Sequence, residues 1–284
     1  MIDTEGGDVG DYDGRMLRQA RPAASTGAIF RDSKANKIGL SHALDGTMRS
    51  GAHDLRTFGT GTLRALASRR ALLEFLEGHR IFYSEMEQCL ESAKGPSATV
   101  WHKFRLLLRR TDALEHDVDL LKSLIGETSS NKGPSPAATA YVARLREASQ
   151  LEASTGTPLL LGHFYTRYLA DLFGGSMLGR PTKLALQLPE TPRFYIHPNE
   201  VGERRRETVE AIYESLNEAG AQLSTAQTRA VVDEAALAFG LNAALYKEGV
   251  GGSGVGMLAG AAVGGLRVAM GHTRDLVMRQ VGVL

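Results

Sequence analysis

LLLGHFYTRYLADLFGGSMLG, residues 159–179, combines the apolar pattern of a buried helix with two adjacent glycines. Each glycine inside a helix costs roughly 1 kcal/mol relative to alanine. A helix carries glycines where it bends or where another group must approach its backbone. Asp171 lies one turn before Gly174 and Gly175, so its carboxylate can share their face. The stretch therefore predicts either a flat ligand held against the glycine pair beside a carboxylate, or another helix packed closely there.

Helical periodicity extends on both sides of this stretch, from about Ile38 to Lys247. One apolar stripe, typical of a helix that buries one face, consists of Leu72, Leu76, Tyr83, Met86 and Leu90. A single helix is expected over residues 101–125, with Leu106 and Leu114 in its apolar set, and Ser224 with Gln227 predicts a capping box at the start of the last helix. Because no alternating strand pattern of useful length occurs, the sequence predicts an all-α fold.

The composition limits the possible functions. The chain has 284 residues, a net charge of +1 and one cysteine, which excludes an internal disulfide framework and a cysteine-rich metal site. We expect a disordered arm over residues 1–36, one helical domain over 37–248 and a Gly/Ala-rich tail over 249–284. No apolar run reaches membrane-spanning length. The N-terminus lacks a signal-peptide core, so either the protein is not targeted this way or a leader has been cleaved.

Three segments carry a resemblance to one family. HFYTRYLADLFGGSMLG, residues 163–179, resembles the distal helix of heme oxygenases, whose animal and bacterial pattern is close to HAYTRYLGDLSGGQ. Its HFY and GGSMLG parts, and Ala170 in place of a glycine, are similar to plant-type members. FLEGHRIFYSEMEQCLES, residues 75–92, and AALAFGLNAALYKE, residues 235–248, resemble two further helices of the family. The resemblance implies an all-α, heme-oxygenase-like multi-helix domain with heme sandwiched between a proximal and a kinked distal helix.

The resemblance also implies an activity. Heme oxygenases use O₂ and reductant electrons to cleave heme, their substrate and cofactor, to biliverdin, CO and Fe²⁺. The electrons would come from ferredoxin or an NADPH-dependent reductase. We expect heme and an electron-donor protein as partners, no nucleic acid, and a monomer in the cytoplasm or a plastid.

Site residues follow from the same motifs. Gly174 and Gly175 would let the distal helix lie against heme, and Asp171 would hold the water that delivers protons. Tyr83 and Arg167 match residues that support this water network. Their alternative role is structural, because buried tyrosines need hydrogen-bond partners in any protein. The further residues expected at the heme are Tyr165, Phe239 and Asn242.

The proximal side offers two alignments of LSHALDGTMRSGAHDLRTFG, residues 40–59. The animal and bacterial pattern makes His53 the iron ligand, with a small insertion. The plant-type pattern fits without gaps but places Arg56 at the ligand position, and arginine cannot bind iron. Arg49 and Arg206 are candidates to hold the heme propionates. The family's key arginine one turn after Arg206 appears here as Glu210 or Ala211, depending on register.

Two other functions are alternatives to a heme oxygenase enzyme. One is a heme-oxygenase-like, non-catalytic protein that lacks a proximal histidine and binds a tetrapyrrole or a partner. The other is a different helical enzyme of the same fold, such as a di-iron protein. The second lacks support because the sequence has no paired carboxylate-and-histidine motif of the E..H kind.

Overall fold

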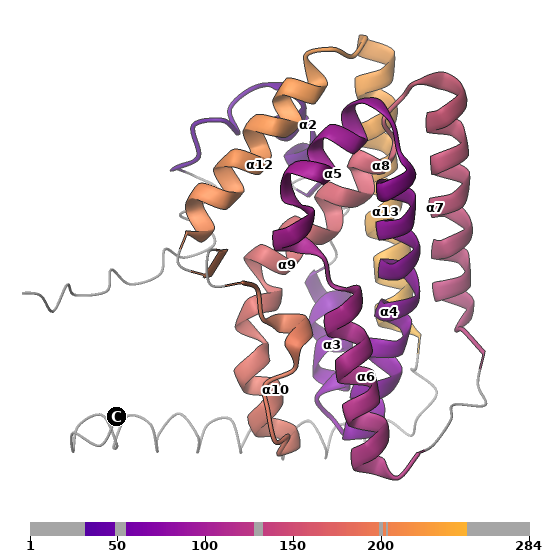
Figure 1. Ribbon diagram of the computed structural model, residues 1–284, viewed down its shortest axis with the longest axis vertical. Coiled ribbons are helices and arrows are strands. Elements are labelled where there is room, and N and C mark those ends of the chain that lie inside the picture. The colour runs from indigo at the N-terminus through magenta and orange to yellow at the C-terminus, as the bar shows by residue number, and fades with distance from the viewer. Residues whose placement is uncertain (1–31, 49–54, 128–132, 199–200, 203, 249–284) are drawn as a thin grey trace, which may run out of the picture.

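The computed structural model describes residues 32–48, 55–127, 133–198, 201–202 and 204–248, and in these residues it is built of helices without strands (Figure 1). The all-α prediction is confirmed. The elements in chain order are α2 (Gly39–Thr47), α3 (Leu55–Ala65), α4 (Arg69–Ser92), α5 (Gly95–Leu108), α6 (Thr111–Ile125), α7 (Pro136–Thr155), α8 (Leu160–Phe164), η2 (Tyr165–Leu169), α9 (Ala170–Phe173), η3 (Gly175–Met177), α10 (Gly179–Leu186), η4 (Arg193–Tyr195), α12 (Arg205–Gly220) and α13 (Thr225–Lys247).

Two long helices form the framework of the bundle. Helix α4 packs against α6 and α7, while α13 packs against α7, α8 and α3 (Figure 1). The predicted apolar stripe of α4 is confirmed, because every one of its five side chains is fully buried. The capping box at the start of α13 is also confirmed, since the Ser224 side chain accepts from the Gln227 backbone and the Gln227 side chain accepts from the Ser224 backbone. Among the described residues, no helix is long and apolar enough to cross a membrane.

The single helix predicted over residues 101–125 is wrong, because the chain breaks between α5 and α6. The Arg110 guanidinium is buried and donates to the backbone carbonyls of Leu108 and Ile196, at 3.0 and 2.6 Å. The Arg110 backbone N–H donates to Glu87 Oε1 at 2.7 Å. These tertiary contacts turn the chain, and Leu106, expected in the apolar face, is 83% exposed.

The last residues of the predicted arm pack against the bundle. The backbone N–H groups of Lys34 and Ala35 donate to Glu210 Oε1 at 2.8 and 2.7 Å. The Asn36 side chain is buried and donates to Asp45 on α2. Residues 1–31 and the tail 249–284 lie outside the described residues, so the domain boundaries stay predictions.

Candidate functional site

The distal stretch is a series of short helical segments, of which only part was expected. Helix α9 ends at Phe173, Gly174 leaves helical geometry at φ −120°, and a 3₁₀ turn follows. The predicted break at the glycine pair is therefore confirmed. A π-helical turn, η2, precedes it and was not predicted. Wider turns of this kind are frequent at functional sites, and this one carries Tyr165 and Arg167.

Among the described residues, nothing packs tightly on the glycine pair. A Cβ atom added to Gly174 would lie 3.7 Å from its nearest described neighbour, the carbonyl oxygen of Ala170 in the preceding turn. At Gly175 the nearest atom is Asp171 Oδ1, also at 3.7 Å. Gly162 is different, because a Cβ there would lie 2.8 Å from the backbone nitrogen of Ala235 on α13. Close helix packing thus explains Gly162, whereas a Cβ atom at either glycine of the pair would meet only atoms of its own preceding turn among the described residues.

A buried polar network adjoins the glycine pair through Asp171. The Tyr83 hydroxyl on α4 donates to Asp171 Oδ2. Arg167 donates to the Tyr83 hydroxyl from Nη2 at 3.0 Å and from Nε at 3.2 Å, and its Nη2 lies 3.6 Å from Asp171 Oδ1. Its Nη1 donates to Asn242 Oδ1 on α13 at 3.0 Å. The structure therefore brings together four predicted site residues from three parts of the chain, all of them buried.

Burial and neighbouring charges shift the pKa values of the three ionisable groups in this network, Asp171, Tyr83 and Arg167. Burial raises the pKa of Asp171, although the Arg167 charge and the Tyr83 hydrogen bond oppose the rise. Burial also raises the pKa of Tyr83 well above its ordinary value. Burial alone would lower the pKa of Arg167, but Tyr83 and Asp171 outweigh it and raise that pKa. Arg167 thus stays charged, while Asp171 holds a proton more readily than an exposed aspartate, which suits a group that receives and passes on protons.

Sequence reasoning missed several residues that adjoin the network. Tyr246 on α13 lies near Arg167, whose positive charge opposes the rise that burial causes in the pKa of Tyr246. Tyr168 on η2 packs edge-on against Tyr83, with ring centroids 5.9 Å apart, and its hydroxyl donates to Glu87 Oε1 at 3.3 Å. Tyr168 follows Arg167 inside the quoted motif and Tyr246 lies in the closing motif, so both had a local signal.

Other predicted residues lie apart from this network. The Tyr165 hydroxyl donates to Asp45 on α2. Phe239 is buried on α13, one turn before Asn242. Arg206 is exposed at the start of α12, where its Nη2 lies 3.9 Å from Asp32. These three side chains therefore stay candidates for other parts of the heme site.

The proximal candidates lie outside the described part of the chain. Residues 49–54, which include Arg49 and His53, are among the undescribed ones, and α3 begins directly after them at Leu55. The assignment of the iron-ligand position to His53 or Arg56 therefore stays a prediction. In the described residues no group of three or more His, Cys, Asp or Glu could hold a metal ion.

The geometry of the distal side fits heme. An open glycine backbone leaves room for a flat ring, and a buried carboxylate beside it can hold water. Heme needs only one protein ligand for its iron, so a cluster of metal ligands is not required.

Comparison with known proteins gives the same family. The model of the family "Heme oxygenase" matches residues 52–248. Heme oxygenase of Rhodella violacea is 33% identical over 144 residues, which are 50% of this chain and 57% of that protein. Heme oxygenase 2 of Synechocystis is 29% identical over 221 residues, which are 77% of this chain and 80% of that protein.

Solved structures agree. The crystal structure of heme oxygenase-2 from Synechocystis in complex with heme and NO matches with a TM-score of 0.60 and 26% identity, over 85% of this chain and 93% of that one. Heme oxygenase 2 from Chlamydomonas reinhardtii, solved without heme, shares the fold with a TM-score of 0.62 at 21% identity, over 74% of this chain and 97% of that one. These relatives support the predicted heme oxygenase enzyme, with heme, O₂ and reductant electrons, over the non-catalytic alternative. The chain therefore belongs to the heme oxygenase family.

Proposed function

We propose that this chain cleaves heme to biliverdin, CO and Fe²⁺, with electrons from ferredoxin or an NADPH-dependent reductase. One observation carries the proposal: the unpacked glycine pair lies against a buried Tyr83–Asp171–Arg167 network. A purely structural polar network has no need of open glycine backbone beside it. Bound heme would supply both the iron that activates O₂ and the ring that is oxidised.

Each distal residue has a separate task in this proposal. Gly174 and Gly175 admit the face of the ring, because neither has a side chain to exclude it. Asp171 holds water and passes protons from its carboxyl group. Tyr83 fixes the Asp171 carboxylate through its hydrogen bond, and Arg167 fixes the Tyr83 hydroxyl. Asn242 orients the Arg167 guanidinium from α13.

For the rest of the heme site, we propose His53 as the iron ligand and Arg49 and Arg206 as propionate partners. Arg206 is exposed and its pairing with Asp32 is long, so it is accessible to an anion. Tyr165 and Phe239 would form part of the wall. The protein would act as a monomer, which sedimentation at micromolar concentration can test.

An absorbance titration with hemin tests the heme site. We expect the wild-type chain to give a Soret band that His53→Ala weakens strongly and His42→Ala, on the preceding helix, does not. A wild-type chain that gives no Soret band would overturn the proposal. An unchanged band in His53→Ala would remove His53 as the ligand and favour the non-catalytic alternative.

Turnover with a reductant tests the distal side. Asp171→Ala should keep the hemin affinity of the wild type and lose biliverdin formation, because the proton-holding carboxyl group is gone. The matched control is Asp233→Ala, which removes an exposed carboxylate from α13. Biliverdin formation by Asp171→Ala at the control's rate would exclude Asp171 from the mechanism.

A further inference from the structure

Among the described residues, His79 on α4 presents a buried hydrogen-bond acceptor without a partner. It lies one turn before Tyr83 on the same face of α4, and its side chain is 1% exposed. Its Nδ1 lies 2.8 Å from the Phe75 carbonyl oxygen, so Nδ1 carries the proton and donates it there. Its Nε2 is then unprotonated and can only accept a hydrogen bond, and no donor lies within hydrogen-bond distance among the described residues. Leaving such an atom unsatisfied costs about 1–3 kcal/mol, which a leucine at this position would avoid.

The ring lies in a chamber of aromatic side chains that adjoins the distal network. The centroid of the His79 ring lies 5.7 Å from that of Tyr246 and 6.4 Å from that of Tyr83, and the Tyr83 hydroxyl accepts a hydrogen bond from Arg167. Phe75 and Phe194 close the chamber at 4.0 and 5.6 Å. Burial, together with the Arg167 charge, lowers the pKa of His79 to about 3. The imidazole is therefore neutral at physiological pH and can accept a hydrogen bond but not supply a proton.

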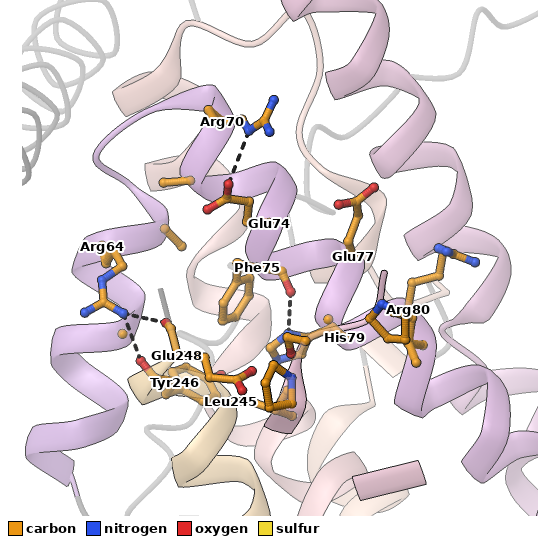
Figure 2. Close-up of a pocket in the computed structure, with 18 of the residues that line it drawn as sticks. Arg64, Arg70, Glu74, Phe75, Glu77, His79, Arg80, Leu245, Tyr246 and Glu248 are labelled. Atoms are coloured by element: carbon orange, nitrogen blue, oxygen red, sulfur yellow. Dashed lines mark hydrogen bonds and ion pairs between the residues drawn. The ribbon is translucent and has the colours of Figure 1, made fainter. Parts of the chain in front are cut away.

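His79 also lines a cavity of about 840 Å³ between α3, α4 and the end of α13 (Figure 2). Charged side chains, among them Arg64, Glu74 and Glu77, line it together with the rings of Phe75 and Tyr246 (Figure 2). A cavity of this size holds many waters, and polar walls retain them. Tyr246 and His79 thus belong both to the cavity wall and to the surroundings of Arg167.

We propose that this cavity supplies water to the distal network from the side of α4, and that His79 Nε2 holds the innermost water. That water would donate to Nε2 and lie among Tyr83, Tyr246 and the aromatic rings. Protons from solvent would pass along the waters to the Tyr83–Asp171–Arg167 network without crossing the heme. His79 is then a positioning residue. Its catalytic effect rests on the proposed function, whereas the water site can be tested without heme.

The water site is tested first in the heme-free chain. ¹⁵N NMR of histidine-labelled protein should show His79 neutral from pH 5 to 8, with the proton on Nδ1 and a hydrogen-bonded Nε2. A water–protein cross-peak should reach the His79 ring. An Nε2 resonance typical of a free acceptor, or no water contact, would overturn the inference and leave the proposed function untouched.

Two substitutions separate positioning from packing. His79→Leu removes the acceptor but keeps an apolar side chain, so we expect stability equal to or above wild type and unchanged hemin affinity. Biliverdin formation should fall about tenfold and show a larger solvent deuterium isotope effect, since proton delivery becomes limiting. His79→Gln, whose amide oxygen can accept in place of Nε2, should restore most of the rate. Full activity in His79→Leu, or an equal loss in both variants, would overturn the inference.

A third substitution tests the cavity itself. Ala71→Phe places a ring in the cavity wall without touching His79, and Ala140→Phe adds the same ring on an exposed position of α7. Only Ala71→Phe should slow turnover and raise the isotope effect. Equal rates in the two variants would exclude this cavity as the water supply.

Discussion

Alanine substitutions at the three distal glycines should separate the ligand face from the packed face. At Gly174 the new methyl group would meet nothing closer than 3.7 Å, and φ is negative, so alanine fits. Replacing a glycine by alanine stabilises a folded protein by about 0.5–1 kcal/mol where alanine can adopt the same backbone conformation. At Gly162 the methyl group would lie 2.8 Å from Ala235 N and 3.0 Å from Val231 O, both backbone atoms of α13. Overpacking of this kind costs about 1–3 kcal/mol.

Urea unfolding of the heme-free variants measures this difference, which should be at least about 1.5 kcal/mol between Gly174→Ala and Gly162→Ala. Turnover should show the reverse order. The methyl group at Gly174 projects to where the ring would lie, and a displacement on the order of 1 Å can cost about a hundredfold in rate. Gly175→Ala should behave like Gly174→Ala. If Gly174→Ala keeps full turnover, or loses as much stability as Gly162→Ala, the open face is not a ligand site.

Three further predictions concern the polar contacts. Burial alone would raise the pKa of Glu234, but hydrogen bonds from His163 and Arg144 hold that pKa at about 2. The ionised Glu234 therefore stabilises the fold above pH 4.5, and this stabilisation is lost as the pH falls from 4.5 toward 2. Glu234→Gln should flatten this part of a plot of unfolding free energy against pH. An Arg167→Lys variant should lower the turnover rate more than the hemin affinity, because a lysine cannot contact Tyr83 and Asn242 together; equal effects on both quantities would contradict this. Tyr165→Phe and Asp45→Asn should show a coupling of about 1.5 kcal/mol in a double-mutant cycle of unfolding, whereas additive effects would show that their hydrogen bond contributes nothing.

Local sequence signals predicted the features that depend on local chemistry. The glycine pair predicted the end of α9, and Ser224 with Gln227 predicted the start of α13, because both effects act within one turn. Asp171 was placed one turn before the glycines by helical spacing alone. Its contact with Tyr83, 88 residues away, was expected only from the family resemblance. Spacing along one helix does not indicate which residue of another helix it meets.

The features that the sequence did not predict arise from tertiary contacts. The break between α5 and α6 depends on Glu87 and Ile196, which lie 23 and 86 residues from Arg110. The apolar periodicity of residues 101–125 continues across the break, so the sequence predicted one helix there. The unpartnered acceptor of His79 likewise becomes visible only once Phe75, Tyr83, Phe194 and Tyr246 surround it.

Glu210 shows how one departure from the family pattern can have a structural cause. In one register the family pattern has a basic, propionate-binding residue at this position, and a carboxylate there would repel a propionate. In the structure this carboxylate accepts from the backbone N–H groups of Lys34 and Ala35. Asn217, two turns later on α12, holds the same segment by donating to the Ala35 carbonyl at 2.8 Å. The negative charge at Glu210 therefore helps to attach residues 33–36 to α12, and in the proposed heme site other cations would bind the propionates.

The distal segment is packed tightly at its start and loosely at the glycine pair, and this difference suits its proposed role. At its start, Gly162 packs on the α13 backbone and the Thr166 hydroxyl donates to the Gly162 carbonyl at 2.8 Å. In its middle, Arg167 ties the same segment to α4 and α13. Among the described residues, a Cβ atom added to Gly174 or Gly175 would meet only atoms of the preceding turn within 4 Å, before the segment packs on Thr191 and Tyr195 again at Gly179. A ring bound at the glycine pair would press on backbone that cannot move away as a unit, because the attachments at Gly162 and Arg167 lie about two to three turns upstream. The position of the ring relative to Asp171 would then be set by the protein rather than by the ligand.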